Sequence, residues 1–123
     1  MNTSGRRQPL AAVLYSVPLL CEAIASALEN VAEVWTFPAR RGDTVGLLRS
    51  VRPDAVVVDD PIEAADVKGW AESQDIPLVE ICLQKHKIRV LQGGEWKESA
   101  GTSAESIRNA VAGSLYARGG IAS

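Results

Sequence analysis

The chain has little of the chemistry that most enzymes use. Its 123 residues include one histidine, His86, and two well-separated cysteines, Cys21 and Cys82. Zinc sites built on His and Cys need three or four such ligands close together, and a Ser-His-Asp triad needs a correctly placed histidine. No apolar run approaches the ~20 residues of a membrane span. We therefore expect no metal, no cofactor, no membrane insertion and no enzymatic activity.

A strong charge of one sign is also lacking. The chain has 13 basic and 15 acidic residues, for a net charge of −2, so no overall field attracts it to nucleic acid and we expect no direct nucleic-acid binding. Two unclustered cysteines are typical of a reducing compartment, which favours a cytoplasmic location. The length fits one domain that needs no disulfide or metal to stabilise it.

What the chain does have is a regular alternation of apolar segments. Short runs rich in β-branched residues predict strands at 9–15, 33–37, 55–58, 77–82 and 88–91. Helical periodicity predicts a helix of about three turns after Ser16, and further helices at 43–52, 61–73 and 102–117. This order favours an α/β fold with a doubly wound, mostly parallel five-stranded sheet. We expect residues 1–8 to be a disordered arm, 9–117 the domain, and 118–123 a flexible tail or linker stub.

Local signals predict how the helices begin and which faces they bury. Ser16 and Asp43 stand where side-chain caps are favoured, and Thr102 with Glu105 has the spacing of a capping box. In the helix at 61–73, the expected inner face is Ile62, Ala65 and Trp70.

One connection does not fit a parallel sheet. Only Leu83–Lys87 separates the last two predicted strands, whereas a parallel crossover needs at least ten residues or so. The fourth helix of a regular alternation is therefore missing or vestigial. The fifth strand either pairs antiparallel with the fourth, which we favour, or reaches the sheet edge without the usual pairing.

Ligands of open α/β sheets bind outside the carboxyl ends of the strands. Asp59 directly follows the wholly apolar strand 55–58 and is expected at the centre of that edge. The candidate ligand-binding residues at this edge are Ser16, Asp59, Asp60, Gln84 and Gln92.

Two segments resemble the receiver domain of response regulators, the two-component signalling module that is joined to helix-turn-helix output domains. They are the first strand–helix junction, Val13–Leu20, and Arg52–Asp59, which looks like the family's Pro-Asp-x-x-x-x-Asp segment. The resemblance covers about residues 9–117 and implies a flavodoxin-like, receiver-like fold. It also implies that Asp59 stands at the phospho-acceptor position.

The chain departs from the receiver pattern at each supporting position. Tyr15 and Ser16 replace the acidic pair that holds Mg²⁺ in receivers. Leu83-Gln84 replace the family's Ser/Thr after the fourth strand, which senses the phosphoryl group. Gln92 replaces the Lys after the fifth strand, which pairs with the phosphoryl charge. The resemblance therefore implies a pseudo-receiver in which Asp59 is a vestigial acceptor, not phosphorylated by the usual Mg²⁺-dependent route. Two alternatives stay open: a phosphorylatable receiver that uses Asp59, and an α/β domain that binds a small molecule at the carboxyl edge.

A domain without chemistry acts through contacts. We expect a protein partner or a homodimer in a signalling or transcription-regulating pathway, with Trp70, Trp96, Arg108 and Tyr116 as contact residues. For the two tryptophans a purely structural role is an equal alternative to a contact role. In that case Trp70 packs under its helix, and Trp96 covers the sheet edge. The chain could work alone or as the amino-terminal piece of a longer regulator.

Overall fold

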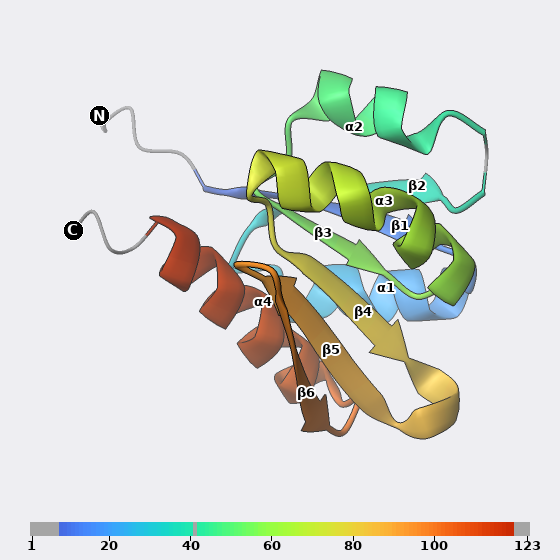
Figure 1. Cartoon of the computed structure of the whole chain (residues 1–123). Helices are drawn as coiled ribbons and strands as arrows, with labels where there is room; N and C mark the ends of the chain where they lie inside the picture. The colour runs from blue at the N-terminus through green and yellow to red at the C-terminus, as the bar shows by residue number, and fades with distance from the viewer. Residues whose placement is uncertain (1–7, 41, 120–123) are drawn as a thin grey trace.

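The computed structural model describes residues 8–40 and 42–119, with side chains up to 116. Six strands form one mixed sheet in the order β2-β1-β3-β4-β5-β6, with helices on both faces (Figure 1). The strands are β1 Leu10–Tyr15, β2 Glu33–Pro38, β3 Ala55–Val58, β4 Leu78–Cys82, β5 Lys87–Gln92 and β6 Glu95–Ala100. The helices are α1 Pro18–Ala27, α2 Thr44–Val51, α3 Pro61–Gln74 and α4 Ala104–Gly119. Nearly all of the predicted arm and most of the predicted tail lie outside the described residues.

The parallel part of the sheet is β2-β1-β3-β4. Every residue of β3 is buried because both faces of this central strand are covered. On one face, apolar side chains of the sheet pack with α1 and α4 around Ile24 and Val111. On the other face, they pack with α2 and α3 around Leu48 and Val67. The α/β prediction is confirmed, and this layering fixes where each strand end emerges.

The carboxyl-terminal half of the sheet is antiparallel. β5 pairs antiparallel with β4, as favoured from the short link, and a 3-10 turn at Leu83–Lys85 is the only helical element in that link. The predicted strand count of five is wrong, because Glu95–Ala100 adds a sixth strand antiparallel to β5. Gly93 and Gly94 connect β5 to β6 with φ of 64° and 82°, a left-handed pair that suits a tight hairpin turn.

The inner face of α3 differs from the prediction. Glu63, Ala64, Val67 and Ala71 are buried, whereas Ile62 is 54% exposed, Ala65 is exposed and Trp70 is half-buried. Small side chains at i, i+3 and i+7 let α3 lie close to the sheet. Ile62 therefore lies off the contact face, whereas Trp70 packs against the border of the core.

Two of the three predicted caps are wrong. Asp43 caps α2 by accepting a hydrogen bond from the Gly46 N–H at 2.9 Å, as predicted. Ser16 does not cap α1; Val17 holds the N-cap position and makes no side-chain bond there. For α4, the Oγ of Ser103, not of Thr102, accepts from the Ser106 N–H at 3.1 Å. The capping position is therefore one residue later than the sequence spacing indicates.

Candidate functional site

The carboxyl edge of the parallel strands gathers four of the five candidate ligand-binding residues. Ser16 follows β1, Asp59 and Asp60 follow β3, and Gln84 follows β4. Gln92 does not join them. Because β5 runs antiparallel and Leu91 pairs with Leu78 at the start of β4, Gln92 lies at the opposite, amino edge. There its side-chain N–H donates to the Ser114 carbonyl at 2.9 Å.

Asp59 binds the backbone that leads into α1. Its Oδ1 accepts from the Ser16 N–H at 2.7 Å and from the Ser16 hydroxyl at 2.9 Å. Its Oδ2 accepts from the Val17 N–H at 3.1 Å. Both carboxylate oxygens are therefore occupied, next to a helix N-terminus that favours negative charge. Asp59 ties β3 to the start of α1, and Ser16 serves it as a donor.

Asp60 is also held within the protein. Its Oδ1 accepts from the Ile62 N–H at 2.9 Å and so caps α3. Its Oδ2 pairs with Arg40 Nε at 3.2 Å, while the Asp60 side chain is 11% exposed. Asp60 therefore positions α3 against the loop before α2.

A buried carboxylate that the sequence reasoning missed completes this arrangement. Glu63 is 1% exposed; its Oε1 accepts from the Arg40 N–H at 3.1 Å and its Oε2 from the Thr44 hydroxyl. Arg40 adopts a left-handed φ of 59° to reach these partners. Together, Arg40, Thr44, Asp60 and Glu63 form what we call the Arg40–Glu63 cluster. The spacing Asp60-x-x-Glu63 resembles a capping box, which is the signal that could have revealed it.

The rest of the carboxyl edge offers exposed apolar groups and two thiols. Val17, shortly after β1, is 39% exposed, and Leu83, directly after β4, is 40% exposed. Gln84, next to Leu83 in the chain, is also exposed. Cys21 and Cys82 are free. Burial raises the pKa of both thiols; the negative charge of Asp59 adds to this for Cys21, and that of Glu80 for Cys82. Neither is therefore an activated nucleophile.

Arg89, on β5, contacts side chains of both neighbouring strands. Arg89 Nη1 pairs with the buried Glu80 at 3.2 Å, and Arg89 Nε lies 3.6 Å from Glu98. The guanidinium also stacks over Trp96, 4.1 Å from the ring centroid. Trp96 is half-buried and packs against the apolar cluster on the α2–α3 face of the sheet. On α4, Arg108 is exposed and Tyr116 is 75% exposed.

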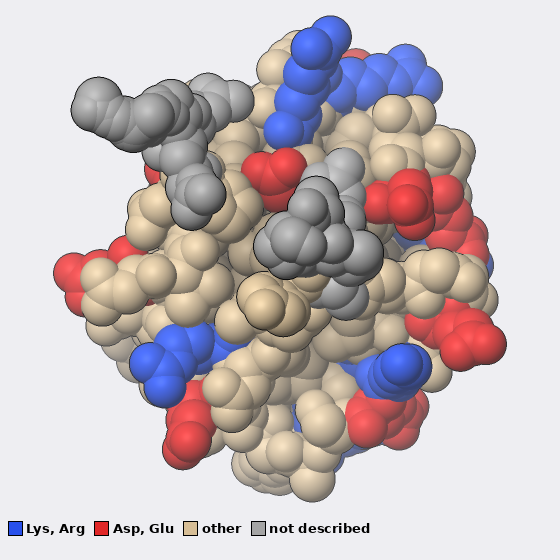
Figure 2. Space-filling model, turned by 90° about the vertical axis from the view of Figure 1, so that its left-hand side faces the viewer, with Lys and Arg blue, Asp and Glu red and all other residues tan. Residues whose placement is uncertain are grey.

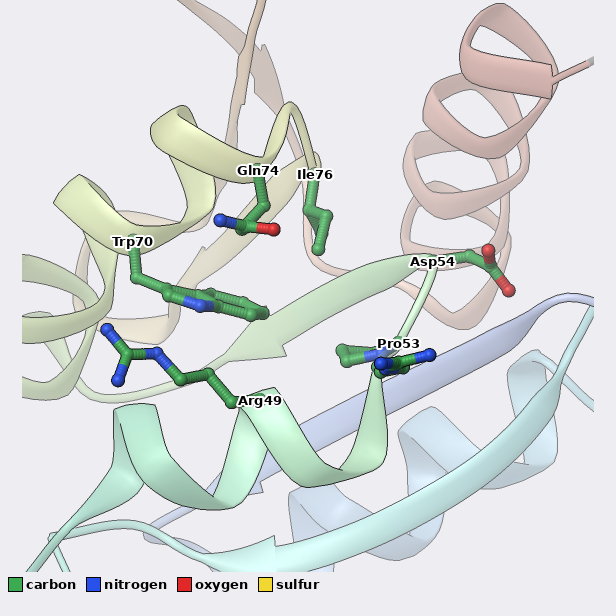
Figure 3. A pocket seen from close by; sticks show the side chains of 7 residues that line it. Arg49, Pro53, Asp54, Trp70, Gln74 and Ile76 are labelled. Carbon is green, nitrogen blue, oxygen red and sulfur yellow. The ribbon is translucent and has the colours of Figure 1, made fainter.

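The amino edge of the sheet carries a pocket. Arg49, Arg52, Pro53, Asp54, Trp70, Gln74 and Ile76 line a pocket of about 520 Å³ (Figure 3). Figure 2 looks at this side of the molecule, where Lys and Arg side chains gather at the top of the view, the α2 side. Sequence reasoning placed no ligand at this edge. It identified Trp70, but not Arg49 on α2 or Arg52 at the end of that helix.

The described part of the chain contains neither a candidate metal site nor a candidate membrane-spanning helix. No group of three or more His, Cys, Asp or Glu residues there could hold a metal ion. None of the helices at 8–40 and 42–119 is long and apolar enough to cross a bilayer.

No protein-family model matches the chain, and no curated protein or solved structure is similar to it. What the chain does must therefore be argued from its own residues.

Proposed function

We propose that the chain is a pseudo-receiver: a non-catalytic regulatory module that works through protein–protein contacts in the cytoplasm. The order of the first five strands, 2-1-3-4-5, is that of flavodoxin-like sheets such as the receiver fold. Asp59 follows the central strand β3, where a receiver carries its phospho-acceptor. The two free cysteines suit a reducing compartment.

The state of Asp59 carries the proposal. Phosphoryl transfer to a carboxylate needs an oxygen free to attack and charges placed to neutralise the phosphoryl group. Both oxygens of Asp59 accept hydrogen bonds, from Ser16 and Val17. Attack on a phosphoryl group would break bonds that hold the start of α1, so the carboxylate is structural.

The supporting charges are absent from their places as well. Tyr15 and Ser16 supply no carboxylate for Mg²⁺, a cation that prefers oxygen ligands of this kind. Arg40, which follows β2, is paired with Asp60. Gln92, at the end of β5, lies at the other edge of the sheet and donates to the Ser114 carbonyl on α4. Substitution and strand direction thus both support a site without phosphorylation chemistry.

The small-molecule alternative at the carboxyl edge receives no support. Of the candidate ligand-binding residues at this edge, Ser16 and Asp59 bind each other, and Asp60 binds the Ile62 N–H and Arg40. Gln84 is exposed.

The phosphorylation test uses the full chain with Mg²⁺ and either acetyl phosphate or beryllofluoride. We expect no mass gain and no Mg²⁺-dependent shift of the Ser16, Val17 and Asp59 amide signals in a ¹⁵N-edited spectrum. Asp59→Asn is the control for any shift caused by the reagents alone. A Mg²⁺-dependent mass gain that Asp59→Asn abolishes would overturn the proposal in favour of a working receiver.

The outer face of α4 is the contact surface that we propose. Tyr116 is 75% exposed there, and Arg108, about two turns earlier on the helix, is exposed as well. Aromatic residues and arginine are both enriched in protein interfaces. A second copy of the chain is the partner that we test first.

Light scattering across a concentration series measures this association. We expect a mass above that of the monomer at high concentration, and a shift to the monomer in Tyr116→Ser. Leu19→Ser is the matched control, because Leu19 is also 75% exposed but lies on α1. A monomer at every concentration would remove the homodimer, and equal effects of both variants would remove the α4 surface.

A further inference from the structure

The pocket at the amino edge lies between the carboxyl-terminal ends of α2 and α3. Its volume of about 520 Å³ falls in the range of roughly 300–1,000 Å³ that is usual for small-molecule sites. The pocket lies at the opposite end of the strands from Asp59. A ligand bound here would therefore leave the carboxyl edge untouched.

The pocket has one flat aromatic wall. Figure 3 shows the indole of Trp70 reaching from α3 toward α2, with Arg49 below it and Gln74 above it. Trp70 is half-buried, while Pro53 and Ile76 beside it are buried. Part of the indole thus stays open to the pocket although its surroundings are packed. A planar ring can stack on such a surface at little cost in side-chain entropy.

Two arginines line the pocket together with this wall. The side chains of Arg49 and Arg52 make no hydrogen bond or ion pair with any residue in the described part of the chain. Arg40 and Arg89, in contrast, are each paired with a carboxylate. An unpaired guanidinium has its planar set of donors free for a carboxylate or a phosphate.

The acid of the pocket lies apart from the aromatic wall. Asp54 Oδ2 accepts from the Leu10 N–H at 2.7 Å and so holds the start of β1. Figure 3 shows its carboxylate beyond Pro53, on the far side from Trp70. The lining therefore places two positive charges and one occupied negative charge around an aromatic surface.

We propose that this pocket binds a small planar aromatic anion, whose ring stacks on Trp70 and whose phosphate or carboxylate pairs with Arg49 and Arg52. The end of α2 would favour cations even without a ligand, so the charges alone define no site. Their combination with a half-buried indole and a cavity of this size does. The inference is independent of the pseudo-receiver proposal, since the two concern opposite edges of the sheet.

The test titrates the ¹⁵N-labelled full chain with four probes. Adenosine monophosphate supplies a ring with a phosphate, benzoate a ring with a carboxylate, inorganic phosphate the charge alone, and adenosine the ring alone. We expect saturable shifts of the Trp70 indole and of the Arg49 and Arg52 side-chain signals with one of the first two probes. Whichever of these binds more tightly identifies the acidic group. The third and fourth probes should bind at least about tenfold more weakly.

Variants then separate the roles of charge and ring. Arg49→Ala combined with Arg52→Ala, and separately Trp70→Leu, should each weaken binding of the better probe about tenfold or more. Arg108→Ala and Trp96→Phe are the controls, and both should bind as the wild type does. A far-UV spectrum confirms that each variant is folded.

Three outcomes would overturn the proposal. The first is no saturable shift with either aromatic anion, and the second is equal affinity for inorganic phosphate. The third is wild-type affinity in the double arginine variant.

Discussion

The two edges of the sheet use their charged groups in opposite ways. At the carboxyl edge, Asp59, Asp60 and Glu63 all accept hydrogen bonds from backbone N–H groups of neighbouring segments. At the amino edge, the side chains of Arg49 and Arg52 make no hydrogen bond or ion pair with the residues that the structure describes. Open α/β sheets usually bind ligands at the carboxyl edge. In this chain the carboxylates of that edge bind groups of the protein itself. The guanidinium groups without a described partner lie at the amino edge.

The largest effect should come from Glu63, the most buried of these acids. Glu63→Ala removes the acceptor of the Arg40 N–H and the nearer acceptor of the Thr44 hydroxyl, whose other acceptor, the Gly42 carbonyl, lies 3.5 Å away. We expect a loss of about 3 kcal/mol in unfolding free energy, measured by urea denaturation. Glu22→Ala, at an exposed position of α1, should change it by less than about 0.5 kcal/mol. Equal effects of the two variants would mean that the Arg40–Glu63 cluster stabilises nothing.

Asp59 should come second, because its carboxylate accepts three hydrogen bonds from a partly exposed site. We expect Asp59→Ala to cost about 1–2 kcal/mol in the same measurement, and Asp59→Asn less, since an amide oxygen still accepts. Asp66→Ala, an exposed change on α3, is the control. An Asp59→Ala variant as stable as the wild type would show that the carboxylate is free, and would reopen the question of its reactivity.

Thiol chemistry tests whether the carboxyl edge is closed to reagents as well. Burial raises the pKa of Cys21 and Cys82, so at pH 8 less thiolate is present in the folded chain than in the unfolded one. We expect Ellman's reagent to react more slowly without urea than with it, because the thiolate is the reactive form. The difference should shrink as the pH rises through the folded-state pKa. A fast reaction of either cysteine at pH 7 in the folded chain would contradict this.

The smallest effects should come from the amino edge. Arg49→Ala should leave stability within about 0.5 kcal/mol of the wild type, because no described interaction is lost. Arg52 has a φ of 56° at the end of α2, a conformation in which glycine is favoured, so Arg52→Gly should gain about 0.5 kcal/mol. Arg40→Ala, which removes the pair with Asp60, should cost about 1 kcal/mol. If Arg49→Ala cost as much as Arg40→Ala, the contrast between the edges would fail.

The parts of the fold that follow local patterns could be predicted from the sequence. The apolar run at 55–58 and the stripe of Ile107 and Val111 appear as the central strand and as the buried face of α4. β6 was missed because Glu95–Ala100 is mostly exposed and has no apolar alternation. Gly93-Gly94 is typical of a hairpin turn. Because no apolar segment follows it, the sequence alone indicates only that the strand ends there.

The candidate site was predicted less well because its contacts connect distant segments. Ser16 is a good local cap by composition, yet its hydroxyl donates to Asp59, 43 residues away. Glu63 could not be assigned to the site from the sequence, since a glutamate indicates burial only when its partners are known. Those partners, Arg40 and Thr44, come from the segment between β2 and α2, which no periodicity connects to α3.

The direction of β5 sets a limit on how the chain could be re-engineered. A lysine substituted for Gln92 would project from the amino edge, beside α4, and would lie the full length of the strand away from Asp59. A catalytic cation after the fifth strand would first require that strand to be reversed. A parallel crossover takes a dozen residues or more, whereas four residues, three of them in a 3-10 turn, join these strands. An insertion of roughly one helix, and not a point substitution, would therefore be needed to place a cation after a parallel fifth strand.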